Sequence, residues 1–295
     1  MPNLSYIKDT QEIRHTPSAA GHDYSQDYLT FVMLEDGSIS CWDDSIFFSA
    51  DNGQTWATGT TNLHEGDRLL AKGNYIGTSQ SSYALFSINA RCYIEGNIMS
   101  IYDATGFRTR TTFNNSEDCL VWLFCSNSNL VSAENLILPV TSLNVGCYQN
   151  MFAECTNLTT APKILPATTL AYGCYEQMFY GCTSLTAAPE LPATTLAGNC
   201  YAYMFQGCTS LTTAPDLLAS NVSDFDMCYT GMFNGCSSLN YIKCLATGSL
   251  GGSYCTMYWT TDVAASGTFV KAASMTDWPD GGDGIPTGWT VVNAS

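Results

Sequence analysis

The chain has 295 residues, of which 45% are hydrophobic and only 12% are charged, a composition that excludes an intrinsically disordered protein. The formal net charge is −16, and this shortage of cations argues against nucleic acid and against anionic lipid surfaces as partners. No apolar run approaches the roughly 20 residues that a membrane-spanning helix needs, so we expect no membrane insertion. The N-terminus lacks a basic start followed by an apolar stretch, so it is not expected to be a secretory signal.

The first part of the chain divides into two segments. Residues 1–27 are polar and show no periodicity, and we interpret them as an N-terminal anchoring arm. Residues 28–112 contain short apolar segments separated by turn signals, such as 28–34, 38–42 and 45–49. Short strands with regularly spaced turns are typical of antiparallel sheets, so residues 28–112 are predicted to form a small β-sandwich domain.

One hairpin in this domain carries a motif. The stretch SADNGQTW, residues 49–56, fits the pattern S-x-D-x-G-x-T-W and resembles the Asp-box hairpin of sialidases and related β-propellers. In that motif Asp51 would cap backbone amides, Gly53 would supply an unusual dihedral angle and Trp56 would pack beneath. Only one such box is present, so we predict a structural role for its residues: Ser49, Asp51, Gly53 and Trp56.

Acidic turns are a second candidate feature. Asp36, Asp43, Asp44 and Asp51 could meet at one end of the β domain and hold calcium, and DGGD at 280–283 is a weaker case. Turns favour aspartate in any case, so solvated turn residues are the simpler interpretation. No metal site is therefore predicted.

Residues 113–263 contain internal repeats, of which LAYGCYEQMFYGCTSL, residues 170–185, is a clear copy. A weaker copy begins at Cys119 and a decayed copy begins at Cys255. Imperfect end units are expected, because an end repeat has no neighbour to cover its apolar face. The four good units have these leading cysteines: Cys147, Cys174, Cys200 and Cys228.

The repeat predicts a helix followed by a short strand. Leu170, Cys174, Met178 and Cys182 recur at intervals of four residues, which indicates an amphipathic helix, and Gly181 suits its C-terminus. The segment that follows contains proline and allows only a short strand. We therefore predict an α/β leucine-rich-repeat solenoid with parallel strands inside and helices outside, closed by a C-terminal cap at 264–295.

The paired cysteines leave several interpretations open. On a helix, cysteines eight residues apart lie about 12 Å apart along the axis, too far for a disulfide. We call the leading cysteine of each pair the first-position cysteine and the one that follows it the second-position cysteine. First-position cysteines of neighbouring units would lie a helix spacing apart, which is also too far for a disulfide, whereas second-position cysteines could come closer. Zinc ligation is disfavoured because the array contains no histidine. Packing as reduced, buried thiols is the preferred interpretation.

No nucleophile elbow, P-loop or dinucleotide fingerprint occurs, so we predict a protein that is not an enzyme and needs no cofactor. Repeat surfaces more often bind than react. A spacer whose surface residues bind nothing would also show residues that vary between units. The residues that vary between units are expected on the exposed helix faces as candidate binding residues: Tyr172, Glu176, Gln177, Tyr180, Asn199, Tyr203 and Gln206.

Units such as CYEQMFYGCTSLTAAPELPATTLA closely resemble the BspA-like leucine-rich repeats of surface proteins from gut Bacteroidetes, over roughly 119–263. Similar modules occur in virion proteins of phages that infect these bacteria. The resemblance implies a decoration or fibre protein on the virion surface that displays the repeats to the host, held by its N-terminal arm to other virion proteins.

Release by cell lysis would remove the need for a leader, which adhesins of this type normally carry. A host surface protein or glycan is a candidate partner, and a homo-oligomer is expected. The alternatives are a bacterial cell-surface adhesin whose leader is missing and a carbohydrate-active enzyme built on the β domain.

Overall fold

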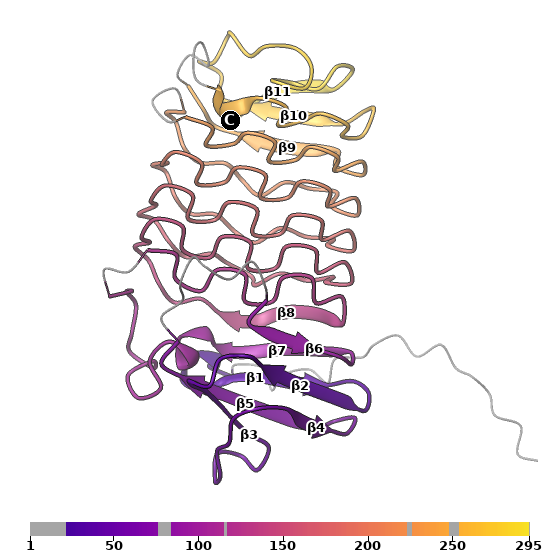
Figure 1. The fold of residues 1–295 in the computed structure, drawn as a ribbon. Helices are drawn as coiled ribbons and strands as arrows, with labels where there is room; N and C mark the ends of the chain where they lie inside the picture. Colours follow the sequence, from indigo (N-terminus) through magenta and orange to yellow (C-terminus); the bar gives the residue numbers. More distant parts are fainter. Residues whose placement is uncertain (1–21, 76–83, 115–116, 223–225, 248–253, 295) are drawn as a thin grey trace, which may run out of the picture.

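A computed structural model describes residues 22–75, 84–114, 117–222, 226–247 and 254–294. The predicted anchoring arm therefore lies largely outside the described residues. Within them, sheets occupy the N-terminal end, a stack of chain turns forms the middle and a parallel sheet closes the C-terminal end (Figure 1). No helix of the described residues is long and apolar enough to cross a membrane.

The N-terminal end contains two sheets. The larger has the strand order β3-β5-β1-β7-β8, and the smaller has the order β4-β2-β6. Several strands fall where the sequence predicted extended segments. The strands are β1 (Leu29–Met33), β2 (Gly37–Cys41), β3 (Ile46–Ser49), β4 (Thr61–Leu63), β5 (Arg68–Gly73), β6 (Phe86–Ile88), β7 (Cys92–Asn97) and β8 (Leu130–Ile137).

Strand β8 joins the N-terminal sheets to the repeats. It pairs in parallel with β7, whereas the other pairs of the larger sheet are antiparallel. On its other side, Ser132 of β8 forms a parallel bridge with Thr160 of the next repeat. Two short 3₁₀ helices, η1 (Tyr24–Gln26) and η2 (Ile98–Ile101), flank this sheet. One continuous set of buried apolar residues runs from Leu29 to Trp289.

Each repeat forms one turn of the stack, which we call a rung. Rungs are held in parallel register by isolated bridges such as Thr160↔Ala187 and Leu217↔Cys244. The stack ends in the parallel sheet of β9 (Tyr241–Cys244), β10 (Thr268–Lys271) and β11 (Thr290–Asn293), beside the 3₁₀ helix η3 (Tyr254–Thr256). Prolines such as Pro189 follow the bridging residues and keep these segments from becoming long strands.

The predicted leucine-rich-repeat solenoid with outer helices is wrong, and so is the α/β class. Among the described residues the regular structure is almost all β, and the only helical elements are the three short 3₁₀ helices. The segment read as an outer helix undulates instead, as the wavy traces in the middle of Figure 1 show. Positive φ angles recur every fourth residue, at Gly173 (65°), Gln177 (56°) and Gly181 (69°), and each one stops a right-handed helix from continuing.

The hydrogen bonds of this segment alternate between two kinds of partner. The backbone N–H groups of Tyr175 and Phe179 donate to Cys200 and Met204 in the next rung, at 3.1 and 2.9 Å. The N–H of Gln177, between them, likewise donates to Ala202 in the next rung, at 2.9 Å. The N–H groups of Glu176 and Met178 donate instead to carbonyls three residues earlier, both at 3.2 Å. Backbone donors are therefore satisfied both within a rung and between rungs.

The same geometry explains the sequence period. Two residues point inwards and the next two outwards, so Cys174 and Tyr175 are buried, Glu176 and Gln177 are half-buried, and Met178 is buried again. A helix would turn about 40° beyond a full turn in every four residues, which spreads a strict four-residue period over a wide face. Over one short segment, a four-residue repeat of apolar residues therefore fits an amphipathic helix almost as well as it fits the rung.

Candidate functional site

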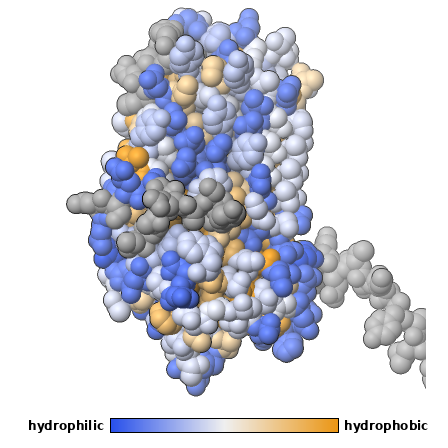
Figure 2. All heavy atoms as spheres, viewed as in Figure 1, coloured by the Kyte–Doolittle hydropathy of each residue, from blue (hydrophilic) through white to orange (hydrophobic). Residues whose placement is uncertain are grey.

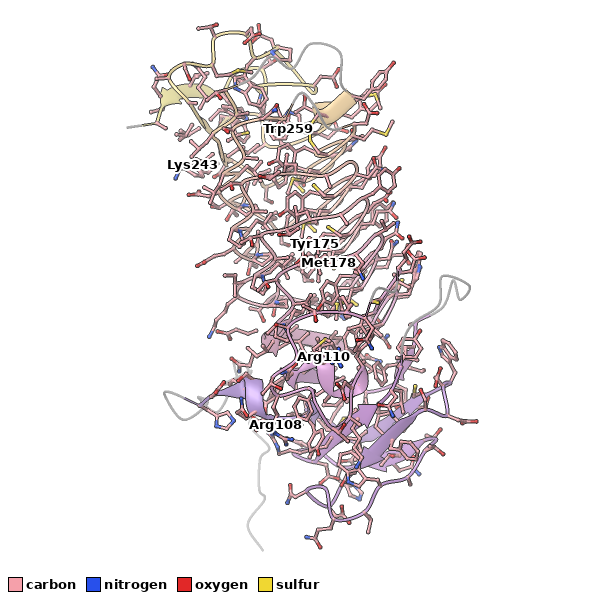
Figure 3. The ribbon with its side chains drawn as sticks, turned by 90° about the vertical axis from the view of Figure 1, so that its left-hand side faces the viewer. Arg108, Arg110, Tyr175, Met178, Lys243 and Trp259 are labelled. Carbon is pink, nitrogen blue, oxygen red and sulfur yellow. A yellow bond between two sulfur atoms is a disulfide. The ribbon has the colours of Figure 1, made fainter. Side chains whose placement is uncertain are left out.

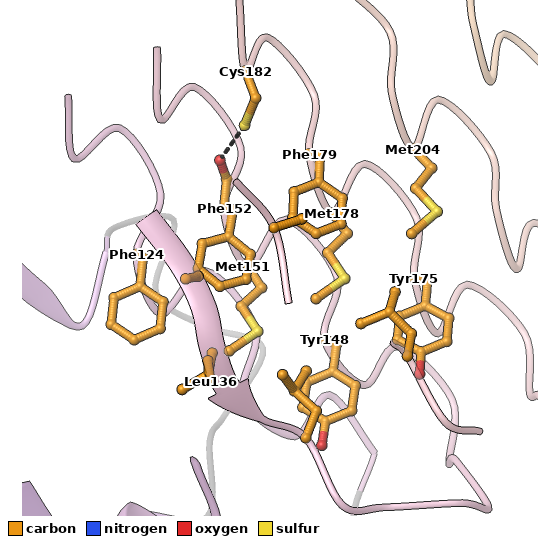
Figure 4. Close-up of a cluster of buried hydrophobic side chains, with 14 of the residues drawn as sticks. Phe124, Leu136, Tyr148, Met151, Phe152, Tyr175, Met178, Phe179, Cys182 and Met204 are labelled. Atoms are coloured by element: carbon orange, nitrogen blue, oxygen red, sulfur yellow. Dashed lines mark hydrogen bonds between the residues drawn. The ribbon is translucent and has the colours of Figure 1, made fainter. Parts of the chain in front are cut away.

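Two columns of stacked rings fill the interior of the rungs. Tyr148 and Tyr175 stack with ring centroids 5.8 Å apart, and Phe152 and Phe179 stack at 5.4 Å. Figure 4 shows these pairs side by side, and Figure 3 places Tyr175 and Met178 inside the stack. Both columns end at Trp259, which lies 6.1 Å from the rings of Tyr229 and Phe233. The columns therefore link the rungs from the N-terminal sheets to the C-terminal end.

The second-position cysteines form a ladder of hydrogen-bonded thiols. Cys182 Sγ donates to the carbonyl of Phe152 at 3.1 Å, as the dashed line in Figure 4 shows. Equivalent bonds join Cys155 to Phe124, Cys208 to Phe179 and Cys236 to Phe205. Burial raises the pKa of Cys236 to about 12, so this thiol stays protonated and remains a donor. The preferred interpretation, reduced and buried thiols, fits this column.

The first rung uses asparagine in place of this cysteine. Asn127 Nδ2 donates to the carbonyls of Phe86 and Phe124, while its Oδ1 accepts from the N–H of Ile88. The amide therefore ties the first rung to strand β6. Sequence reasoning missed this residue, although aligning Phe124 with Phe152 places Asn127 opposite Cys155.

The geometric argument about first-position cysteines was wrong. Cys228 and Cys255 form a disulfide with Cα atoms 4.9 Å apart, whereas helical units would have kept them too far apart. Without helices, neighbouring rungs approach to about the spacing of paired strands, roughly 4.8 Å. Equivalent cysteines of neighbouring rungs can therefore approach each other closely at the first position as well as at the second.

The predicted binding residues lie on the outward positions of the undulating segments. Tyr172 is exposed, and the other six are half-buried. Gln149 Nε2 donates to Glu176 Oε2 at 3.0 Å, and Asn199 also hydrogen-bonds the Glu176 carboxyl group. Burial raises the pKa of Glu176, and these two hydrogen bonds partly offset the effect. The structure thus brings Glu176 and Asn199 together across neighbouring rungs.

The tyrosines of this face pack across glycines of the next rung. A Cβ atom at Gly198 would lie 3.0 Å from the Tyr172 ring, and one at Gly231 would lie 2.3 Å from the Tyr203 ring. Gln177, Tyr180 and Gln206 are half-buried on the same side of their rungs. In the view of Figure 2, strongly hydrophobic side chains are scattered and form no single large patch.

Short-range hydrogen bonds hold the Asp-box hairpin together. Asp51 accepts from the N–H and hydroxyl of Thr55 at 2.9 and 2.6 Å, and Ser49 Oγ donates to Asp51 at 2.7 Å. These bonds lower the pKa of Asp51 to about 2, with the hydroxyl of Thr55 the largest cause. Trp56 Nε1 donates to the carbonyl of Gly53, whose φ is 84°.

The other acidic turn residues bind nearby backbone groups. Asp36 accepts from the N–H of Glu65 at 2.9 Å, Asp43 accepts from Ser45 at 2.8 Å, and Asp283 accepts from Tyr258 at 2.6 Å. Asp44 is exposed. Asp36, Asp43 and Asp283 therefore cap backbone amides.

Comparison of the chain with protein-family models, curated proteins and solved structures finds no match.

Proposed function

We propose that the protein is a non-enzymatic display protein on the surface of a bacteriophage virion. In this proposal the rung stack is a stiff spacer, and its outward face contacts a protein or glycan on the bacterial host. The N-terminal arm attaches it to other virion proteins, and several copies assemble together.

The continuous ring columns are the observation that carries the spacer role. In a stacked repeat, each unit is stabilised mainly by its neighbours. Here the rings of Phe124, Phe152, Phe179 and Phe205 follow one another at 5.3, 5.4 and 5.6 Å. A column packed at this spacing resists bending, because bending would open gaps between buried rings. The sequence resemblance to surface and virion proteins supports the location.

The outward face supports contact with a partner. Tyrosine supplies a large, amphipathic contact area and is frequent at binding hot spots. Tyr172, Tyr254 and Tyr258 are 57%, 62% and 54% exposed, which leaves their rings available to a partner.

The location is tested by immunogold labelling of phage particles purified on a density gradient. The proposal predicts gold on intact particles and the protein in the particle fraction. Recovery only with the bacterial envelope would favour the adhesin alternative, and recovery only in the soluble fraction would contradict surface display altogether.

The binding face is tested with labelled protein and host cells. The double variant Tyr172→Ala/Tyr203→Ala is expected to lower cell binding several-fold, since it removes two rings from the outward face. Glu190→Ala is the matched control, because Glu190 is exposed on the strand-like segment of a rung and not on this face. Equal losses from both variants would contradict the assignment of the face.

A further inference from the structure

The first-position cysteines form a buried column parallel to the ring columns. Neighbouring members lie in adjacent rungs, at a spacing of about 4.8 Å for paired backbones, and a disulfide spans Cα separations of about 4.4 to 6.8 Å. Each neighbouring pair is therefore close enough to be linked. The members are Cys119, Cys147, Cys174, Cys200, Cys228 and Cys255.

One bonded pair fixes the pairing at the C-terminal end. Cys228 is linked to Cys255, and beside this bond the N–H of Tyr229 donates to the carbonyl of Cys255 at 2.8 Å. The N–H of Tyr175 donates to the carbonyl of Cys200 in the same way, at 3.1 Å. The N–H of Tyr201 donates to the carbonyl of Cys228 likewise, at 3.1 Å, so this register permits a link from Cys200 to either neighbour, and the bond at Cys228 decides between them.

A second contact fixes the pairing at the N-terminal end. The thiols of Cys119 and Cys147 are hydrogen-bonded to each other, which raises the pKa of Cys119 and lowers that of Cys147. The N–H of Tyr148 donates to the carbonyl of Cys119 in the preceding rung, at 2.9 Å, whereas that of Tyr175 donates to the following rung. The backbone bond at Tyr148 therefore joins the rung of Cys147 to that of Cys119.

We propose that the column closes as three disulfides in an oxidising environment: Cys119–Cys147, Cys174–Cys200 and Cys228–Cys255. The contacts at the two ends leave Cys174 and Cys200 as each other's neighbours, so every member has a partner. Each bond links two adjacent rungs, and the junctions from Cys147 to Cys174 and from Cys200 to Cys228 stay without a covalent link. This inference does not depend on the proposed function, although such links suit a protein exposed outside the cell.

The oxidant is a low-molecular-weight disulfide such as oxidised glutathione. The thiolate of Cys147 attacks one of its sulfur atoms, forms a mixed disulfide and releases one small thiol. The thiolate of Cys119 then attacks the sulfur of Cys147, the protein disulfide forms and the second small thiol leaves. Two protein thiols lose two protons and two electrons, and the small disulfide is reduced to two thiols. Both sulfur atoms are buried in the folded protein, so exchange takes place as the rungs assemble.

Disulfide mapping of the full chain tests the proposal. The protein is refolded in reduced and oxidised glutathione, unfolded in urea with N-ethylmaleimide, and digested with pepsin at acidic pH, which prevents reshuffling. Mass spectrometry of the unreduced digest is expected to find the three linked peptide pairs, and the second-position cysteines alkylated. Finding only Cys228–Cys255, or links from Cys147 to Cys174 or from Cys200 to Cys228, would overturn the proposal.

A variant checks the pairing independently. Cys174→Ala is expected to leave Cys200 alkylated while the links at both ends persist. Cys182→Ala, in the second-position column, is the control and is expected to keep all three links. A disulfide between Cys200 and Cys228 in the Cys174→Ala variant would contradict the pairing. If a variant fails to fold, the map of the unaltered chain still decides the question.

Discussion

The thiol of Cys182 donates a hydrogen bond to the carbonyl oxygen of Phe152 in the preceding rung, at 3.1 Å. Both residues are fully buried, so water cannot replace either partner. The bond repeats from rung to rung, and each one joins the backbone of one unit to a side chain of the next. Cysteine suits this position because it fills apolar space and still supplies a donor.

Cys182→Ala is expected to lower the free energy of unfolding by about 1–3 kcal/mol, because it leaves a small cavity and removes one of the two hydrogen bonds to the buried Phe152 carbonyl, which also accepts from the N–H of Cys155. Cys182→Ser keeps a donor and is expected to lose less. Urea unfolding of the three proteins measures the difference. A serine variant less stable than the alanine variant would contradict the role of the hydrogen bond.

Phe179→Ala is expected to cost about 3–5 kcal/mol, because it removes a fully buried ring from the middle of its column. Tyr172→Ala, at an exposed ring, should change stability by no more than about 0.5 kcal/mol. Denaturation curves of both variants make the comparison. Similar costs at the two positions would show that the column does not hold the rungs together.

The substitution Gly173→Ala distinguishes the undulating rung from a helix, because its effect on stability has opposite signs in the two structures. Inside a helix, alanine is more stable than glycine by about 1 kcal/mol. In the rung the φ angle of Gly173 is 65°, and an L-residue there costs about 1–2 kcal/mol. We therefore expect destabilisation, measured as a lower urea midpoint. A stabilised Gly173→Ala protein would contradict the undulating backbone.

Asp51→Asn tests the Asp-box through its pH dependence. Folding lowers the pKa of Asp51 from 3.8 to about 2, so the ionised carboxylate stabilises the folded hairpin above pH 3.8. This contribution is lost as the pH falls from 3.8 through about 2. Thermal midpoints of the original and variant proteins should differ near neutral pH and converge in acid. The control is Asp44→Asn, at an exposed residue outside the motif.

The sequence predicted the repeats, a capping role for Asp51 in the Asp-box turn and several N-terminal strands, because each depends on local chemistry. Turn residues around β1 and β2 mark strand ends, and the Ser49–Asp51 bond joins residues two positions apart. The Asp-box signal therefore needed no knowledge of the tertiary structure.

The backbone path of the rung could not be predicted from local chemistry, because it depends on hydrogen bonds between rungs. Gln177 has a positive φ angle although its residue type does not favour one, and bonds to the neighbouring rungs hold it there. The link between Cys228 and Cys255 was missed for the same reason, since the helix assumption set the distance between units. The pairing of Glu176 with Gln149 likewise required the register of adjacent rungs.

The hydrogen bond of the Tyr175 amide tests the undulating rung most directly. Scalar coupling across hydrogen bonds, measured by NMR on labelled protein, identifies the carbonyl that accepts from this amide. The structure predicts coupling to the carbonyl of Cys200, in the next rung, where the N···O distance is 3.1 Å. Coupling to the carbonyl of Ala171, the partner expected in an α-helix, would contradict it.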